Sequence, residues 1–407
     1  LKPDDSGLIQ DYFNKLLPHK LFPLASPKSV VVCGVSKTRV NPGRVMYDKF
    51  KSHVPTYNLS ELSDAELRNG FDLAVIAVPK TQVASVMGKV NAKSFMVLSN
   101  GFEEFGDVIL QSVQQPIQGS NCVGSIINQK DFTFLSNVQL AKTDTPKIAV
   151  VSQSGAFLAL LAEKLQVSYG FSVGNLSNLT LADFVEFLAL QNEKTIAVYA
   201  ENFTKRDVER MNKLQKKLQL EILVYSQKNA EQAQAHTGKT GLTYQEVKNT
   251  LKATFFNQIS QIVQFVKVNQ LKKAKTLQIC QSGFVSGVFS TVLNTGELSQ
   301  EQKTEIQSVI QREKLKAKVG ATLDTTPIKM EHYIEFAKIL LGGEHKVVIS
   351  YLNMLHNAEE RQMFLRFLRS LNKQEKEKVV VVQDGGEPIQ VEGIYVIASI
   401  DSLQAGQ

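Results

Sequence analysis

The sequence predicts an α/β protein made of three consecutive α/β units. Short runs of β-branched and other apolar residues, typical of buried parallel strands, recur along the chain. Segments of helix length separate these runs, which indicates parallel sheets with right-handed crossovers. We expect an N-terminal arm at residues 1–26, followed by domains at 27–143, 144–268 and 272–407.

The strand-like runs fall into three groups. The first group is 29–34, 72–79 and 94–99, the second is 147–152 and 195–200, and the third is 275–280, 347–350 and 379–382. Between the two runs of the second group, the spacing of Phe157, Leu161 and Leu165 predicts a helix over 155–167.

Composition excludes several classes of protein. The 407 residues are 43% hydrophobic and 21% charged, and no run approaches the roughly 18 apolar residues of a spanning helix, so we expect a soluble chain. The net charge of +7 is spread along the sequence without an aromatic-basic motif, so no nucleic-acid partner is expected. Three scattered cysteines favour a reducing compartment and predict no metal site. A start at Leu1 is compatible with a cleaved targeting segment, so the mitochondrial matrix is expected, with the cytoplasm as the alternative.

The glycine after the first strand indicates a phosphate-binding turn. Gly34 lets the backbone approach a ligand, and a following helix would offer free N–H groups to phosphate. Ser36 and Lys37 add a hydroxyl group and a cation. Because Ser36 and Arg39 stand where the dinucleotide fingerprint has glycines, an NAD-linked oxidoreductase is disfavoured. A tight turn without a ligand is the alternative.

Five later motifs carry more information in combination than singly. They are Gly-Ser-Asn-Cys-Val-Gly at 119–124, Ser-Gln-Ser-Gly at 152–155, Ser-Val-Gly-Asn at 172–175, Tyr-Ala-Glu-Asn at 199–202 and Ala-His-Thr-Gly at 235–238. In this order they resemble the α-type part of the NDP-forming acyl-CoA synthetases, the superfamily of succinyl-CoA synthetase and ADP-forming acetyl-CoA synthetase. The resemblance covers nearly the whole chain. It implies a Rossmann-like CoA-binding domain followed by two flavodoxin-like ligase domains.

The resemblance also implies a phosphoryl relay. His236 matches the histidine that carries the phosphoryl group, and a neutral imidazole is a competent nucleophile near pH 7. Glu201 matches the carboxylate that orients this histidine, with a solvated glutamate at a strand end as the alternative. Ser152, Ser154 and Gly155 match the phosphate-binding start of a helix, with an ordinary serine N-cap as the alternative.

CoA is the implied cofactor. Its phosphates are expected near Gly34, Ser36 and Lys37. Its pantetheine arm is expected to pass Val78, Pro79, Asn100, Asn121 and Cys122. Cys122 itself is expected to be a packed residue rather than a nucleophile.

Two departures from the family pattern affect the first domain. Between Gly34 and Asp72 the chain is about a dozen residues short, so we expect the second strand of this domain to be missing. Ser120 stands where the family prefers a proline that would stiffen the turn.

The leading hypothesis is therefore an α-type subunit that binds CoA, relays phosphate through a phosphohistidine and needs a separate ATP-grasp β-type partner for the nucleotide and Mg. The alternative is a catalytically degenerate paralogue, a pseudoenzyme that serves as a structural subunit of a larger, mitochondrial complex, because a fold can outlast its chemistry.

Overall fold

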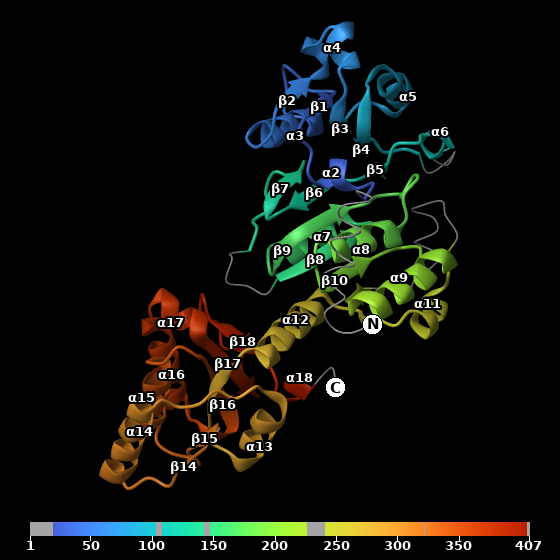
Figure 1. Ribbon diagram of the computed structural model, residues 1–407. Helices are drawn as coiled ribbons and strands as arrows, with labels where there is room; N and C mark the ends of the chain where they lie inside the picture. The colour runs from blue at the N-terminus through green and yellow to red at the C-terminus, as the bar shows by residue number, and fades with distance from the viewer. Residues whose placement is uncertain (1–18, 103–107, 142–146, 226–240, 321, 405–407) are drawn as a thin grey trace. The chain divides into compact units, whose positions relative to one another are not determined.

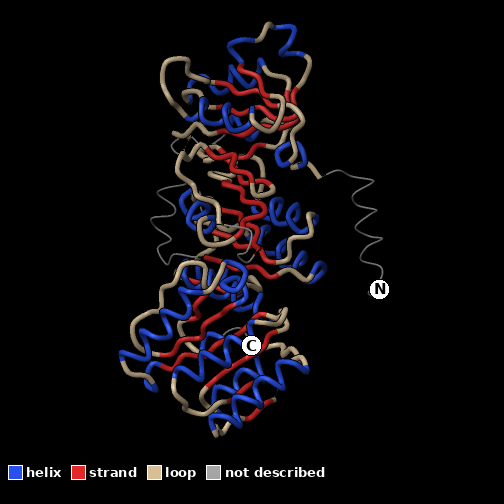
Figure 2. Tube along the Cα trace, turned by 90° about the vertical axis from the view of Figure 1, so that its left-hand side faces the viewer, coloured by secondary structure: helices blue, strands red, loops and turns tan. Residues whose placement is uncertain are grey.

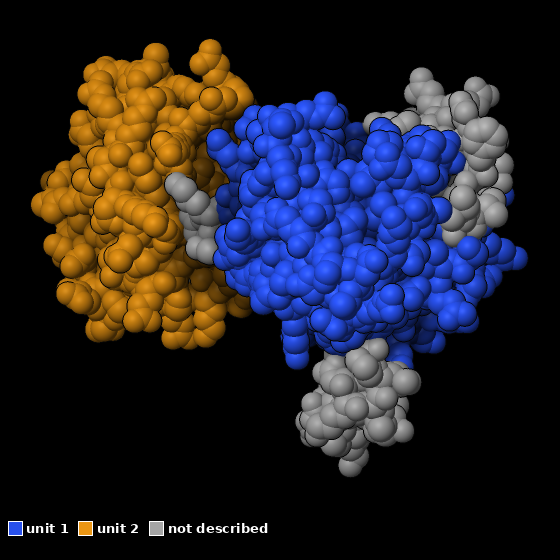
Figure 3. Space-filling view, turned by 90° about the horizontal axis from the view of Figure 1, so that it is seen from above, with its two compact units in different colours: residues 1–262 blue, residues 263–407 orange. Residues whose placement is uncertain are grey.

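A computed structural model of the chain describes residues 19–102, 108–141, 147–225, 241–320 and 322–404 (Figure 1). The chain divides into two compact units, residues 1–262 and 263–407 (Figure 3). The described residues form three sheets, and helices flank their strands (Figure 2). This confirms the predicted α/β class. None of the helices in these ranges has the length and apolar character needed to cross a membrane.

The first sheet, in unit 1, is parallel throughout. Its strand order is β2 (Thr56–Asn58), β1 (Val30–Cys33), β3 (Phe71–Ile76), β4 (Ala92–Val97) and β5 (Ile117–Gly119). One face packs on α2 (Phe22–Ala25) and α3 (Pro42–Lys51), and the other on α4 (Asp64–Arg68), α5 (Lys80–Lys89) and α6 (Val108–Gln111). Because both faces are covered, β1, β3 and β4 are nearly continuous apolar runs.

The prediction that this domain lacks its second strand is wrong. Residues Thr56 to Asn58 pair in parallel with Val30 to Val32 of β1. This edge strand has only three residues, and Tyr57 is exposed, so it leaves no apolar run in the sequence. Asn58 ends the strand by accepting the N–H of Ser60 at 3.2 Å, which starts the 3₁₀ helix η1 (Leu59–Glu61).

The second sheet, also in unit 1, is mixed. Its order is β12 (Thr254–Phe256), β11 (Glu221–Tyr225), β10 (Thr195–Tyr199), β8 (Lys147–Ser152), β9 (Gln166–Ser172), β6 (Gly124–Ile127) and β7 (Lys130–Thr133). The pairs β9–β6 and β6–β7 are antiparallel, and the other pairs are parallel. Its helices are α7 (Gly155–Ala162), α8 (Leu181–Leu190), α9 (Lys205–Leu218) and α11 (Tyr244–Thr250).

Two details of the second sheet differ from expectation. The β6–β7 hairpin lies within the range 27–143 but pairs with β9, so it belongs to the second sheet. The helix expected over 155–167 ends at Ala162, and β9 begins at Gln166. Val167, Tyr169 and Phe171 suit a strand, and pairing with β8 satisfies its backbone.

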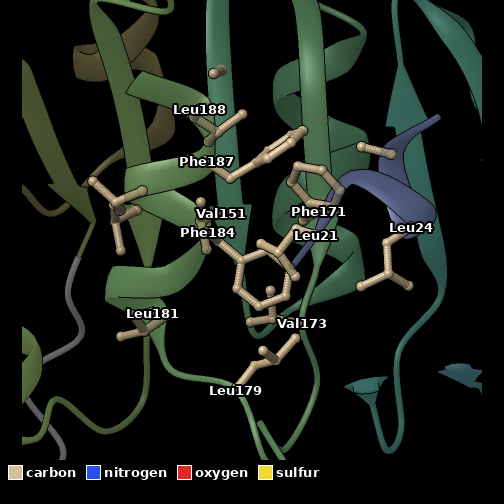
Figure 4. Close-up of a cluster of buried hydrophobic side chains, with 14 of the residues drawn as sticks. Leu21, Leu24, Val151, Phe171, Val173, Leu179, Leu181, Phe184, Phe187 and Leu188 are labelled. Atoms are coloured by element: carbon tan, nitrogen blue, oxygen red, sulfur yellow. The ribbon is translucent and has the colours of Figure 1, made fainter. Parts of the chain in front are cut away.

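A continuous core joins the first two sheets. Leu21 and Leu24, at the start of the described chain, are fully buried in one cluster with Phe184 and Phe187 of α8 (Figure 4). An ion pair of 3.1 Å between Lys20 and Asp183 reinforces this packing. Leu21, Leu24 and Ala25 of the expected arm are therefore part of the core of unit 1.

The third sheet forms unit 2. Its order is β14 (Lys318–Val319), β15 (Thr322–Asp324), β13 (Thr276–Cys280), β16 (Lys346–Leu352), β17 (Val379–Asp384) and β18 (Tyr395–Ile397), with only β14 antiparallel. One face packs on α14 (Gln300–Glu313), α15 (Met330–Leu341) and α16 (Ala358–Ser370). The other face packs on α12 (Ile259–Lys273), α13 (Gly283–Val292) and α18 (Asp401–Gln404). The remaining elements are η2 (Asn353–Leu355) and α17 (Lys373–Lys378).

Candidate functional site

The turn after β1 is held closely between β3 and α3. Gly34 has a φ of +98°, and a Cβ there would lie 2.8 Å from the carbonyl carbon of Ala77. The side chain of Asn41, the N-cap of α3, donates to the carbonyl oxygen of Gly34 at 2.8 Å. A Cβ on Gly43 would lie 2.8 Å from the carbonyl carbon of Gly34. The amino end of α3 therefore lies against Gly34, although the helix starts eight residues later in sequence.

Internal hydrogen bonds close the loop between Gly34 and α3. The Ser36 hydroxyl accepts the N–H groups of Thr38 and Arg39 at 3.3 and 3.2 Å. The Arg44 guanidinium donates twice to the carbonyl oxygen of Ser36, at 3.1 and 2.8 Å. Lys37 is exposed on this loop. The predicted phosphate turn thus presents a lysine and a helix N-terminus, while the Ser36 hydroxyl serves the loop itself.

The residues expected along the pantetheine path follow three adjacent strands. The Ser99 hydroxyl, after β4, donates to the carbonyl oxygen of Val78 at 2.5 Å. The Asn121 N–H, after β5, donates to the carbonyl oxygen of Ser99 at 2.9 Å. Pro79 and Asn100 are exposed in the same two loops. The structure therefore brings Val78 and Asn121 to one edge of the first sheet, through Ser99.

Cys122 is buried below this edge. Its side chain is 1% exposed, and its thiol donates to the carbonyl oxygen of Val97 at 3.3 Å. Burial raises the pKa of Cys122 to about 12. At neutral pH the thiolate population is negligible, so this residue packs rather than reacts.

The turn after β5 is anchored to the loop that follows β9. Ser120 accepts the N–H of Asn175 at 2.9 Å through its carbonyl oxygen, and its own N–H donates to Ser177 Oγ at 3.0 Å. The Ser177 hydroxyl donates to the carbonyl oxygen of Gly119 at 2.8 Å. Gly174 has a φ of +54°, and a Cβ there would lie 2.8 Å from the carbonyl oxygen of Asn121. Ser120 therefore sits in a turn that the second sheet fixes.

The amino end of α7 completes the junction. Ser154 caps this helix by accepting the N–H of Phe157 at 3.3 Å, which is the ordinary N-cap given above as the alternative to phosphate binding. Ser152 is buried, and its hydroxyl donates to the carbonyl oxygen of Ser154 at 2.6 Å. A Cβ on Gly155 would lie 2.7 Å from Val123 Cγ2. Gly155 thus lets α7 begin directly against the segment after β5.

Sequence reasoning assigned no role to Gln153, although it lies between the two serines. Its Oε1 accepts the N–H groups of Glu201 and Asn202 at 2.7 and 3.3 Å. Its Nε2 donates to the carbonyl oxygen of Gly174 at 3.2 Å. These partners lie 21 to 49 residues away, so no local pattern could have revealed them.

Glu201 follows β10 and is half-buried beside aromatic rings. Phe157, Tyr199 and Tyr225 contact one another with ring centroids 5.1 to 5.7 Å apart. Burial, and then the charge of Glu201, raise the pKa of Tyr199 to about 12. His236 lies outside the described residues, in the range 226–240 that starts directly after β11.

The arrangement favours an anion at the carboxyl edge of the second sheet. The ends of β8, β9 and β10 are neighbours there, and α7 points its amino end to the same place. Within the described ranges, no group of three or more His, Cys, Asp or Glu residues could hold a metal ion.

Comparison with known proteins shows which families the chain resembles. Residues 145–271 match the family of succinyl-CoA ligase like flavodoxin domains. The chain is 30% identical over 255 residues to the ADP-forming 4-hydroxybutyrate–CoA ligase of Nitrosopumilus maritimus. This match covers 53% of this chain and 36% of that ligase. It is also 30% identical over 252 residues to the alpha subunit of the ADP-forming acetate–CoA ligase II of Pyrococcus furiosus. This match covers 52% of this chain and 54% of the Pyrococcus furiosus protein. The matched region thus spans about half or less of these relatives.

Two solved structures share the fold over nearly the full chain. One is the dinucleotide forming acetyl-coenzyme A synthetase 1 of Ca. Korarchaeum cryptofilum, in complex with phosphate and ADP, with a TM-score of 0.66, 17% identity and 94% of both chains covered. The other is a protein of Pyrococcus horikoshii OT3, with a TM-score of 0.59, 19% identity and coverage of 94% and 96%.

Proposed function

Since the chain is related to the NDP-forming acyl-CoA synthetases, we propose that it is an α-type subunit that binds CoA and relays a phosphoryl group through His236. The nucleotide site belongs to an ATP-grasp β-type partner. One observation carries this proposal: the motifs at 119–124, 152–155, 172–175 and 199–202, far apart in sequence, meet at one edge of unit 1. The range containing His236 starts from the same edge, after β11.

His236 would act as the nucleophile of the relay. A ring nitrogen attacks the terminal phosphorus of a nucleoside triphosphate held by the partner; an N–P bond forms, the P–O bond breaks and the nucleoside diphosphate leaves with the electron pair. Glu201 would hold the other ring nitrogen and so fix the tautomer. The amino end of α7 would stabilise the phosphoryl oxygens.

CoA would be held as a substrate by the turn after β1. The fit rests on two features of the structure: Lys37 is exposed on the loop, and the amino end of α3 lies against Gly34. A lysine and a helix N-terminus together suit the phosphates of CoA. Bound there, CoA would supply the thiol that accepts the acyl group.

The relay is tested by phosphorylation of the full chain. With an ATP-grasp partner and γ-labelled ATP, we expect acid-labile, base-stable label on the wild type and on the control His53→Ala, whose imidazole lies on the exposed loop after α3. His236→Ala should carry no label. An unlabelled wild type, or a labelled His236→Ala, would refute the proposal.

One observation favours the alternative, in which the chain is a structural subunit of a larger complex. The hydroxyls of Ser36, Ser152 and Ser154 were expected to hold phosphate. Each of them instead forms hydrogen bonds with backbone groups two or three residues away in the sequence. Native purification separates the two functions. Co-migration with a large complex that lacks an ATP-grasp chain supports the structural role, and co-purification with an ATP-grasp chain supports the enzyme.

A further inference from the structure

The side chain of Gln153 joins three of the converging loops. It extends from the end of β8, where its backbone N–H donates to the carbonyl oxygen of Tyr199 at 3.0 Å. Its amide oxygen meets the loop after β10 at Glu201 and Asn202, and its amide nitrogen meets the loop after β9 at Gly174. One residue thus connects the ends of three neighbouring strands.

The chemistry of the glutamine amide matches each of these contacts. A carboxamide oxygen has two lone pairs, and both find backbone donors here, at 2.7 and 3.3 Å. The NH₂ group supplies the donor that the Gly174 carbonyl oxygen needs, at 3.2 Å. A carboxylate could replace the acceptor but not the donor, and an apolar side chain could replace neither.

These contacts hold the backbone of Glu201 in place. The residue lies just beyond β10, where ladder hydrogen bonds no longer hold the backbone. By accepting two consecutive N–H groups, Gln153 holds the peptide units on both sides of the Glu201 α-carbon. The backbone of Glu201, and with it the base of its side chain, is then set relative to the start of α7.

The same amide reaches the turn after β5. Gly174, whose carbonyl oxygen accepts from Gln153, packs against Ser120 and Asn121 so closely that no Cβ would fit. The next N–H, of Asn175, donates to the carbonyl oxygen of Ser120. Gln153 therefore lies between the turn expected to receive the CoA thiol and the carboxylate expected to orient the phosphohistidine.

We propose that Gln153 is a positioning residue that holds Glu201 in place for the phosphoryl transfer to His236. This inference rests on the proposed function. It concerns the placement of the carboxylate, so it predicts a slower transfer rather than a loss of CoA binding or of the fold.

Three variants test this inference in the full chain with its ATP-grasp partner. Gln153→Met keeps the length of the side chain but loses every hydrogen bond, Gln153→Glu keeps the acceptor only, and Gln82→Met, on the exposed face of α5, is the matched control. We would measure the single-turnover rate of label transfer to His236 between pH 5.5 and 9, CoA affinity by calorimetry, and amide hydrogen exchange in a peptide that contains residues 201 and 202.

Gln153→Met should slow transfer on the order of tenfold to a hundredfold, change CoA affinity by less than about threefold and speed exchange of the two amides about tenfold or more. Gln153→Glu should regain part of the rate. It should also shift the acid limb of the pH–rate profile to higher pH. The new carboxylate at position 153 lies near Glu201, and two neighbouring negative charges make it harder for both carboxyl groups to be ionised. Gln82→Met should behave as wild type.

The outcomes separate the two proposals. If Gln153→Met transfers label as fast as the wild type while His236→Ala takes none, the relay stands and the positioning role is refuted. If Gln153→Glu shows the same rate and pH profile as Gln153→Met, the acceptor contacts are not what matters, which also refutes it. If the wild type takes no label, the relay fails and the positioning role fails with it.

Discussion

Replacing Gly174 by alanine should destabilise unit 1 through two separate effects. The backbone of Gly174 has a φ of +54°, a left-handed conformation that costs an L-residue with a Cβ about 1–2 kcal/mol. The new Cβ would also meet the carbonyl oxygen of Ser120 and lie 2.8 Å from the carbonyl oxygen of Asn121. Both obstacles are backbone atoms, which cannot swing aside as a flexible side chain can.

The two effects should add. Overpacking of a filled site costs about 1–3 kcal/mol, so the total loss is about 2–5 kcal/mol. For a unit of this size, such a loss lowers the melting temperature by roughly 5–15 °C. The turn after β5 should shift as well, and CoA affinity should fall with it if that turn lies on the path of the thiol.

Differential scanning calorimetry of the full chain measures this, with Gly88→Ala as control. Gly88 lies in α5, and a Cβ there would meet no atom within 4 Å, so alanine should stabilise the same unit by about 0.5–1 kcal/mol. Both substitutions should act on the melting transition of unit 1. Gly88→Ala should raise its temperature, and Gly174→Ala should lower it. A Gly174→Ala chain that melts like the wild type would refute the close packing of these loops.

Two further predictions concern buried titratable groups. In native chain at pH 8, Cys122, whose pKa burial raises to about 12, should react with a thiol reagent on the order of 10³-fold more slowly than after unfolding in guanidinium; equal rates would contradict its burial. Burial lowers the pKa of His356 in unit 2 from 6.5, against the opposing charge of Glu360, so the unfolded chain binds a proton that the folded unit does not. Stability of unit 2 should therefore fall as the pH drops below about 6.5, and His356→Phe, which keeps the ring stacked on Tyr351, should flatten this dependence in thermal melts from pH 7.5 to 5.5. A pH profile identical in both proteins would show that His356 is not the cause.

The strands that the sequence predicted well are those buried on both faces. Two examples are the strands at Val30 to Cys33 and Val379 to Val382, which lie inside parallel sheets. Each is a continuous apolar run, so the sequence alone predicts a strand there. Strand β2 at an edge, with Tyr57 exposed, has no such run. The start of α3 was not predicted to the residue, although Asn41 followed by Pro42 is a typical N-cap and N1 pair.

The site was predictable only as a set of motifs. The order of glycines and serines along the chain indicated a phosphate-binding site. It did not show which of the serine hydroxyls already form hydrogen bonds within the protein. The hydroxyl of Ser152 donates to the carbonyl oxygen of Ser154, two residues away, and the hydroxyl of Ser154 caps α7. Gln153 acquires its role from loops up to 49 residues away, and such contacts depend on sheet order rather than on local pattern.

Calorimetry of CoA binding to the purified chain tests the central claim most directly. The account predicts a dissociation constant well below 1 mM for the wild type, and a loss of tenfold to a hundredfold in Lys37→Ala, since a charge-assisted phosphate contact is worth about 1.5–3 kcal/mol. Lys89→Ala, at the exposed end of α5, should bind as the wild type does. Binding weaker than about 1 mM, or equal affinities of wild type and Lys37→Ala, would contradict a CoA site at the Gly34 turn and favour the structural role.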